Sequence, residues 1–197
     1  MPHPFRQILC AAALVTGSLT TALAADAPKD PARQTSWGLY VDSREAYQMK
    51  TGPKGNEILL IDVRDPVEIM FTGFADTVDL NIPYMTANRH KWNDKKNVYA
   101  MEVNPAFEAQ VAKALSERKL TKDAPVVLMC RSGGERGAPS AKMLEGKGYS
   151  QVYVVTDGFE GDTVKEGDKK NWRLVNGWKN SGLPWSYTLN KAKFPLE

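Results

Sequence analysis

Residues 125–149 read P-V-V-L-M-C-R-S-G-G-E-R-G-A-P-S-A-K-M-L-E-G-K-G-Y. An apolar run ends at Cys130, two glycines follow, and helix-forming residues begin near Arg136. This order predicts a buried strand, a tight loop and a helix, with a thiol at the turn. The N–H groups of such a loop and the positive end of the helix dipole favour the thiolate, which is the nucleophilic form of cysteine. Cys130 is therefore the candidate nucleophile.

The residues beside Cys130 suit the binding of an anion. Arg131 and Arg136 offer guanidinium donors that match an oxyanion. Gly133 and Gly134 allow the backbone to curl where a Cβ would obstruct it. A lone cysteine is more often a buried small hydrophobic residue. Its place between a strand and a glycine-rich, arginine-flanked turn favours a chemical role instead.

The N-terminus has the composition of an export signal. Arg6 supplies a positive start, residues 8–14 an apolar region, and Ala22-Leu23-Ala24 an A-x-A cleavage site, so residues 1–24 are predicted to be a signal peptide cleaved near Ala24. The apolar run is shorter than the roughly 20 residues that span a bilayer, so no stable membrane insertion is expected after cleavage. An exported, periplasmic protein is predicted. Residues 25–35 are polar and proline-containing, which predicts a flexible leader.

Removal of 24 of the 197 residues leaves 173, enough for one domain with a sizeable core. The formal charge falls from +3 to +2 because Arg6 is lost, and this small imbalance gives no argument for nucleic acid as a partner. Cys130 is then the one remaining cysteine, although export leads to a compartment where disulfides form. The single remaining histidine, His90, lies in no cluster of metal-ligand residues, so neither a metal nor a cofactor is expected.

The chain from residue 36 to 190 is predicted to form one α/β domain, a central parallel sheet with helices on both faces. The predicted strands are residues 39–41, 58–61, 81–83, 126–129 and 152–155, and the predicted helices are residues 42–49, 67–71, 105–119 and 136–146. Asp62 and Arg64 follow a buried strand directly, and open α/β sheets place their sites at such carboxyl ends.

Two longer stretches interrupt the alternation of strands and helices. Residues 84–103 are polar and basic with Trp92 and Tyr99 among them, and we expect a solvated surface loop there rather than an excursion beside the site. Residues 160–175 carry a charged insertion. The tryptophans that follow, among them Trp172 and Trp178, are expected to pack in the core or at its edge.

Taken together, the motifs resemble a rhodanese domain over residues 37–186. The matching pieces, in order, are L-L-I-D-V-R-D-P-V-E at 59–68, N-I-P at 81–83, V-V-L-M-C-R-S-G-G-E-R at 126–136, K-G-Y-x-x-V-Y at 147–153 and S-G-L-P-W at 181–185. Each piece is weak on its own. Their order and spacing make the resemblance specific.

The resemblance implies a sulfurtransferase. In that family a catalytic cysteine takes a sulfane sulfur from a small inorganic sulfur anion such as thiosulfate, becomes a persulfide, and passes the sulfur to a thiol or to cyanide. Cys130 would carry the sulfur, with Asp62 and Arg64 shaping the site or forming a strand-end ion pair. The substrate- and anion-binding residues implied in this way are Arg131, Ser132, Gly133, Gly134, Glu135 and Arg136.

The loop departs from the usual rhodanese pattern. Cys130 to Arg136 spans seven residues, a C-x5-R length similar to that of rhodanese-fold phosphatases and arsenate reductases, and Gly73-Phe74-Ala75-Asp76 stands where G-H-I-x-G-A is common. A phosphatase would need a general acid, for which Asp62 and Glu135 are candidates. A non-enzymatic module that binds sulfur or an anion and docks through Trp92 or residues 172–185 is a third hypothesis.

Overall fold

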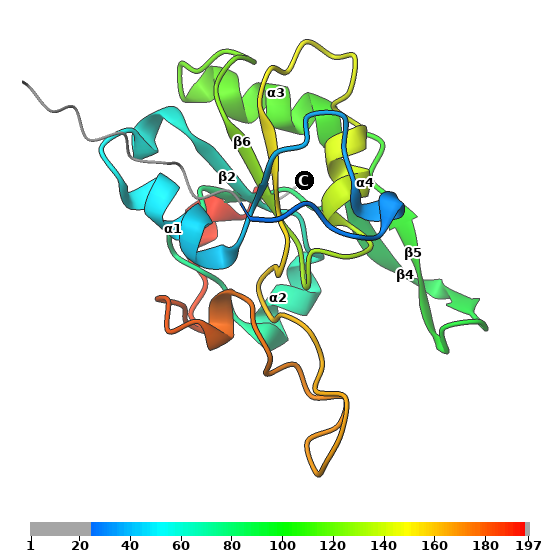
Figure 1. The fold of residues 1–197 in the computed structure, drawn as a ribbon. Coiled ribbons are helices and arrows are strands. Elements are labelled where there is room, and N and C mark those ends of the chain that lie inside the picture. Colours follow the sequence, from blue (N-terminus) through cyan, green and yellow to red (C-terminus); the bar gives the residue numbers. More distant parts are fainter. Residues whose placement is uncertain (1–24, 196–197) are drawn as a thin grey trace, which may run out of the picture.

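The computed structural model describes residues 25–195, which form an α/β domain built on a five-stranded parallel sheet (Figure 1). The sheet order is β1-β7-β6-β2-β3, so β6, the strand that leads to Cys130, lies at the centre. The strands of this sheet are β1 (Tyr40–Val41), β2 (Leu59–Asp62), β3 (Leu80–Asn81), β6 (Val126–Met129) and β7 (Val152–Val155). The predicted parallel α/β fold is confirmed.

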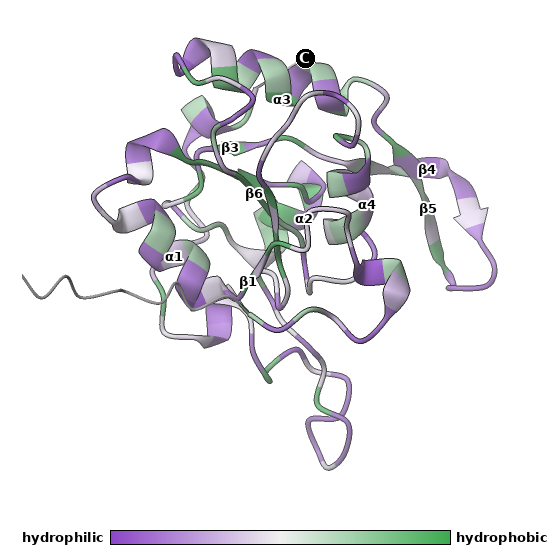
Figure 2. Cartoon of the chain, turned by 45° about the horizontal axis from the view of Figure 1, so that its top comes forward, coloured by the Kyte–Doolittle hydropathy of each residue, from purple (hydrophilic) through white to green (hydrophobic). Residues whose placement is uncertain are grey.

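Helices cover both faces of the sheet because the buried strands are apolar on both sides. The α-helices are α1 (Ser43–Thr51), α2 (Pro66–Thr72), α3 (Phe107–Glu117) and α4 (Gly137–Lys142), and the short 3₁₀ helices are η1 (Pro31–Arg33), η2 (Gly55–Glu57), η3 (Trp178–Asn180) and η4 (Lys191–Lys193). Leu59 and Ile61 pack in the core cluster that contains α3 and α4 residues, whereas Leu60 packs with residues of α1 and α2 on the other face. Figure 2 shows β6 as a hydrophobic strand enclosed between these helices.

Local signals set the starts of α1 and α2. Asp42 caps α1 by accepting from the Glu45 N–H, and the Glu45 carboxylate accepts from the Asp42 N–H, which completes a capping box. Asp65 caps α2 and Pro66 opens it. Gly73, at φ 98°, ends α2.

Two predicted helices differ from the structure at their ends. The helix predicted to begin at residue 105 begins at Phe107 in α3. The Asn104 side chain accepts from the Ala106 N–H just before this helix. The predicted helix 136–146 is an α-helix for only six residues, Gly137–Lys142, and continues as turns. The dipole of so short a helix is small, so it contributes less to the site than the sequence suggested.

The prediction of a loop at residues 84–103 is wrong. This stretch forms an antiparallel hairpin of β4 (Met85–Asn93) and β5 (Val98–Val103), which projects from the body of the domain (Figure 1). Both strands are exposed along most of their length, so no buried face marks them in the sequence. A shift of register between Asn88 and Trp92 bends the hairpin.

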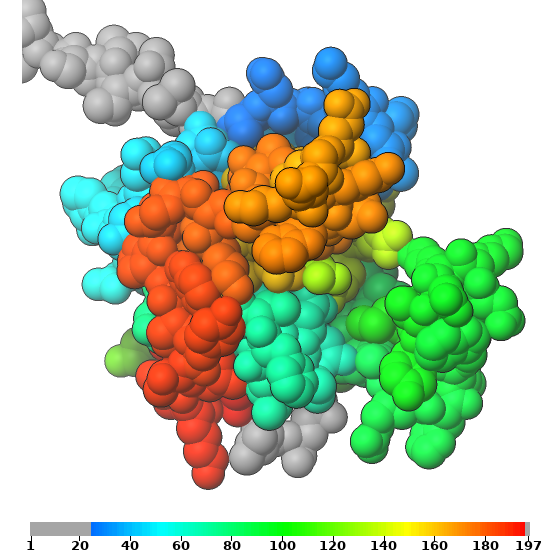
Figure 3. All heavy atoms as spheres, turned by 90° about the horizontal axis from the view of Figure 1, so that it is seen from below, coloured from blue at the N-terminus to red at the C-terminus, as the bar shows by residue number. Residues whose placement is uncertain are grey.

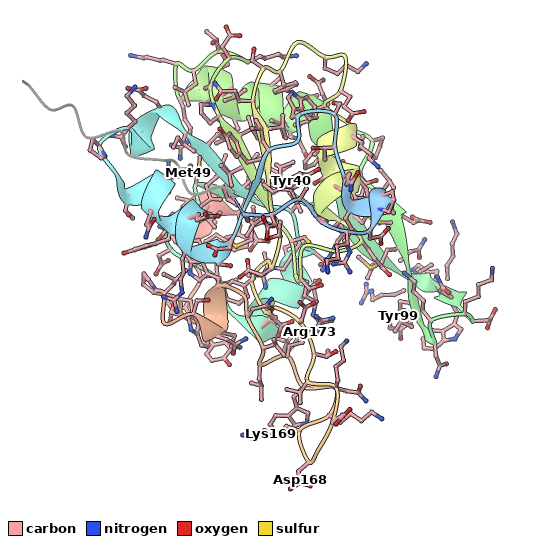
Figure 4. All side chains as sticks on the ribbon, in the orientation of Figure 1. Tyr40, Met49, Tyr99, Asp168, Lys169 and Arg173 are labelled. Atoms are coloured by element: carbon pink, nitrogen blue, oxygen red, sulfur yellow. The ribbon has the colours of Figure 1, made fainter. Side chains whose placement is uncertain are left out.

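A second projection follows β7. Residues 162–175 extend from the domain, and Asp168 and Lys169 lie at its tip (Figure 4). Thr163 and Arg173 form an antiparallel bridge at its base. Of the tryptophans expected to pack, Trp178 is buried in the core, whereas Trp172 is 61% exposed.

The described part of the chain begins at Ala25, so the predicted signal peptide, residues 1–24, lies outside it. The segment predicted as a flexible leader contains η1, and the Ala32 carbonyl accepts from Lys142 of α4. Among residues 25–195 no helix is long and apolar enough to cross a membrane.

Candidate active site

Cys130 lies at the carboxyl end of the central strand, immediately after Met129. Its side chain is almost fully buried, at 1% exposure. Because β2, β6 and β7 are parallel, the residues that follow each of them meet at this edge of the sheet. The residues that meet there are 62–68, 130–136 and 156–160.

Two glycines allow the loops after β6 and β7 to interlock. Gly133 has φ +64°, and a Cβ there would lie 1.7 Å from the Thr156 carbonyl oxygen. Gly158 also has φ +64°, and its Cβ would lie 2.6 Å from the Cys130 carbonyl oxygen. The Phe159 N–H donates to that same carbonyl at 2.8 Å. The curl expected at Gly133 is therefore present, and it fixes the backbone of Cys130.

The loop presents unused backbone donors. The N–H groups of residues 131–136 donate to no protein acceptor in the part of the chain that the structure describes. Gly133 and Gly134 are buried, and buried N–H groups in proteins are almost always paired. A run of unpaired ones beside a thiol is suited to hold an anionic sulfur or oxygen.

Arg136 is held by a carboxylate that the sequence analysis did not assign to the site. Its Nη1 and Nη2 donate to the two oxygens of Glu68 at 2.6 and 3.0 Å, a bidentate pair. Burial raises the pKa of Glu68, but the hydrogen bond and charge of Arg136 outweigh it, and the pKa lies below its ordinary value. Burial lowers the pKa of Arg136, and the Glu68 carboxylate more than reverses this.

Arg131 is held in the same way. Its Nε donates to the Glu160 carboxylate at 2.5 Å and lies 3.9 Å from a Glu68 oxygen. The loop thus carries two guanidinium groups, each matched by a carboxylate. An anion that uses either group must share it with Glu160 or Glu68.

Asp62 and Arg64 form a pair that is fully buried. The Arg64 guanidinium donates to both Asp62 oxygens, to the Thr72 hydroxyl and to the Gly73 carbonyl, and it lies 4.0 Å from the centre of the Phe159 ring. Both side chains are 0% exposed. This arrangement is the strand-end ion pair, and it joins the end of β2 to the end of α2 and to Phe159.

The remaining predicted residues take different places. Gly134 is buried, and a Cβ on it would lie 3.4 Å from the Arg33 guanidinium of η1. Ser132 is half-buried. Glu135 is exposed and accepts from Lys96 Nζ of the hairpin at 2.6 Å. The hairpin therefore does contact the Cys130 loop.

Glu68 and Glu160 are the residues that the sequence analysis missed. Glu68 ends the quoted D-V-R-D-P-V-E segment, and its place in the first turn of α2 could have directed attention to it. Glu160 follows the Gly158-Phe159 turn. Neither pairing can be derived from spacing, because each joins residues far apart in the chain.

Two hollows of the surface lie outside the loop itself, although the second is lined by Thr156 and Arg33, which adjoin Gly133 and Gly134. One, of about 700 Å³, is lined by residues of β3, α3 and the C-terminal segment, and the other, of about 410 Å³, lies between residues 26–33 and Asp157. Neither is lined by residues 130–136. Within residues 25–195 no group of three or more His, Cys, Asp or Glu side chains could hold a metal ion.

The fold and the loop together define an α/β domain with a buried cysteine at the carboxyl end of its central strand, followed by a loop whose backbone N–H groups have no protein acceptor among residues 25–195. The family model of the rhodanese-like domain matches residues 44–163, and the chain belongs to this family.

Similar proteins span most of the domain. An uncharacterized protein of Rickettsia prowazekii, RP600, is 29% identical over 146 residues, which are 74% of this chain and 94% of the relative. The rhodanese domain-containing protein CG4456 of Drosophila melanogaster is 28% identical over 121 residues, 61% of this chain and 95% of the relative. The crystal structure of Rv0390 from M. tuberculosis is similar in fold, with a TM-score of 0.52 at 24% identity over 76% of this chain and 97% of that chain.

Proposed function

We propose that the protein is an exported sulfurtransferase that carries a sulfane sulfur on Cys130. The observation that carries this proposal is the run of six backbone N–H groups, residues 131–136, that directly follow Cys130 and have no protein acceptor in the described structure. The family of the chain and the buried thiol support it.

The first half-reaction loads the cysteine. The Cys130 thiolate attacks the outer sulfur of thiosulfate, the sulfur–sulfur bond of the donor breaks, and sulfite leaves with the bonding electrons. The loop N–H groups stabilise the charge on the resulting persulfide. Arg131 and Arg136 orient the anionic donor, in competition with Glu160 and Glu68.

The second half-reaction removes the sulfur from the Cys130 persulfide. A thiolate or cyanide attacks the outer sulfur of the persulfide, the sulfur–sulfur bond breaks, and Cys130 leaves as a thiolate. Cys130 is the one free cysteine of the described residues, so no other thiol in this part of the chain can take the sulfur. The acceptor therefore comes from outside the domain.

Steady-state turnover tests the proposal. With thiosulfate and cyanide, the purified protein is expected to form thiocyanate, and Cys130→Ser is expected to abolish this. Thiocyanate formation at the rate of the buffer control, or equal rates for the wild type and Cys130→Ser, would show that Cys130 carries no sulfur.

The seven-residue loop favours phosphatase or arsenate reductase chemistry as a second candidate, since its length matches C-x5-R loops. The two acids considered for it are poorly placed. Asp62 is fully buried and bound to Arg64, and Glu135 is exposed and bound to Lys96. Hydrolysis of an aryl phosphate that is lost in both Cys130→Ser and Arg136→Ala would establish this candidate instead.

A further inference from the structure

Nearly all the exposed hydrophobic side chains lie on three elements that contact the Cys130 loop or its partners. Among residues 25–195, every large hydrophobic side chain that is exposed, apart from Tyr187, belongs to α2, to the β4–β5 hairpin or to residues 162–175. We call these three elements the rim. The most prominent of their side chains are Met70, Phe71, Trp92, Tyr99, Trp172 and Val175.

Each element of the rim is joined directly to the loop or its partners. Glu68 of α2 binds Arg136. Lys96 of the hairpin binds Glu135. The third element begins beside Glu160, which binds Arg131, and the Arg173 Nη1 donates to Gly161. In Figure 3, α2 lies between the C-terminal segment and the hairpin, with the 162–175 segment along its border.

This exposure is too concentrated to be the ordinary scatter of apolar residues on a surface. Phe71 is 75% exposed, Trp172 61% and Trp92 52%. Trp92 and Tyr99 already pack edge to face at 5.4 Å between ring centres, which presents a rigid aromatic pair to solvent. Large exposed apolar side chains that gather on a few neighbouring elements are typical of interaction sites. Thiosulfate and cyanide, which are small and hydrophilic, would make no use of it.

The charges of the rim indicate the sign of its partner. The hairpin carries Arg89, Lys91, Lys95 and Lys96 against Asp94 and Glu102. Residues 162–173 carry Lys165, Lys169, Lys170 and Arg173 against Asp162, Glu166 and Asp168. Both projections are therefore net positive, and the one charged residue of α2, Glu68, is paired with Arg136. A symmetric dimer through the rim would set positive surfaces against each other, which disfavours a second copy of this chain.

We propose that the acceptor of the persulfide sulfur is a protein that docks on the rim through an acidic and apolar face and presents a cysteine to Cys130. This inference rests on the proposed function, which requires an acceptor from outside the domain. In the docked complex the partner thiolate attacks the outer persulfide sulfur, the sulfur–sulfur bond breaks, Cys130 leaves as a thiolate and the partner cysteine becomes the persulfide. No oxidant or reductant is consumed.

Peptide binding tests the docking separately from sulfur transfer. The probe is a short acidic peptide with a central serine, in place of cysteine, flanked by leucine, phenylalanine and acidic residues. The control peptide has lysines in place of the acidic residues. Binding to the mature protein is measured by calorimetry at low and high salt. We expect the acidic peptide to bind about tenfold more tightly than the control peptide, and salt to reduce the difference.

Variants locate the binding surface. Phe71→Ser and Trp172→Ser are each expected to weaken binding of the acidic peptide about fivefold or more, as the loss of a buried aromatic contact would. Lys95→Glu on the hairpin should weaken it, whereas Lys54→Glu is the matched control. Lys54 precedes β2, at the opposite edge of the sheet from Cys130, and both lysines are exposed. Unchanged thermal unfolding shows that each variant is folded.

Cysteine-containing peptides then report transfer. From protein loaded with sulfur, the acidic cysteine peptide should accept the sulfur faster than free cysteine, and Phe71→Ser should slow only the peptide reaction. Equal binding of the two peptides, no detectable binding, or rim variants without effect would overturn the docking proposal. The docking proposal would also be overturned if the protein dimerised, or bound to phosphatidylglycerol vesicles, and Phe71→Ser abolished that dimerisation or vesicle binding. Failure to load Cys130 from thiosulfate would overturn the proposed function alone, because the binding measurements need no persulfide.

Discussion

At the scale of single residues, the site depends on contacts between loops that follow different strands. Gly133 and Gly158 let the loops after β6 and β7 approach until backbone touches backbone. Glu68 and Glu160 fix the two arginines of the loop. Cys130, Gly133 and Arg136 could be predicted, because a strand, a thiol and a glycine pair follow one another in sequence. The carboxylates could not, because their partners are brought near only by the sheet.

Replacement of Gly133 by alanine is expected to unfold the loop. Its Cβ would lie 1.7 Å from the Thr156 carbonyl oxygen at a φ of +64°, so backbone must move. We expect a loss of more than about 4 kcal/mol in the free energy of unfolding. Gly146→Ala is the matched control, since Gly146 has φ +69° and nothing within 4 Å of its Cβ position.

For Gly146→Ala we expect a loss of about 1 kcal/mol, from the left-handed backbone alone. Urea denaturation of both variants measures the difference. Equal losses in the two proteins would show that the close approach at Thr156 does not constrain Gly133.

Glu68→Gln should destabilise the protein in a pH-dependent way. The Glu68 and Arg136 side chains are 19% and 11% exposed, so the loss at neutral pH is expected to be about 1–3 kcal/mol. The pKa of Glu68 is lower in the folded protein than its ordinary value of 4.5. Its contribution is therefore complete above that ordinary value and disappears as the pH falls through the lower, folded value.

The difference between wild type and Glu68→Gln should accordingly shrink in acid. Urea denaturation at a series of pH values from neutral to below the ordinary pKa of glutamate measures it. A difference that stays constant or grows as the pH falls would contradict the ion pair as the source of the stability.

At the scale of elements, the hairpin is the feature that the sequence did not reveal. A strand is recognised by alternation of buried and exposed residues, and β4 and β5 bury neither face. The β2, β6 and β7 runs, by contrast, are apolar throughout and were predicted closely. The capping box of α1 can be predicted for the same reason as the central loop, because its two residues lie only three positions apart in the sequence.

Shortening of the hairpin should leave the domain folded. Its base is fixed by the Asn104 N–H that donates to the Tyr84 carbonyl and by the Ala87 N–H that donates to Asp65. Replacement of residues 88–100 by an Asn-Gly turn keeps both bonds and removes the exposed strands. We expect the free energy of unfolding to change by no more than about 1 kcal/mol.

Urea denaturation and circular dichroism check this expectation. The exposed pair of Lys96 and Glu135 is removed as well, but pairs in solvent contribute about 0–1 kcal/mol. Cooperative unfolding lost in the shortened protein would mean that the hairpin is part of the folding core.

At the scale of the whole molecule, the parallel sheet with helices on both faces could be predicted from the alternation of apolar runs and helical segments. The sheet gathers residues 62–68, 130–136 and 156–160 at one edge, and this meeting explains both the buried ion pair and the site. The predicted export of the protein depends on residues 1–24. That these residues are a signal peptide remains a prediction from composition.

Export can be tested with the full-length chain. A chain expressed in full length in a Gram-negative host is expected to appear in the periplasm with Ala25 as its first residue. N-terminal sequencing of the fractionated protein checks this. An uncleaved chain that starts at Met1 and stays in the cytoplasm would contradict the predicted signal.

The measurement that tests the central claim most directly is the intact mass of the mature protein after incubation with thiosulfate and removal of the excess. A sulfur carrier is expected to gain the mass of one sulfur atom, to lose it on treatment with cyanide, and to gain nothing as Cys130→Ser. No gain in mass, or the same gain in Cys130→Ser, would contradict the account.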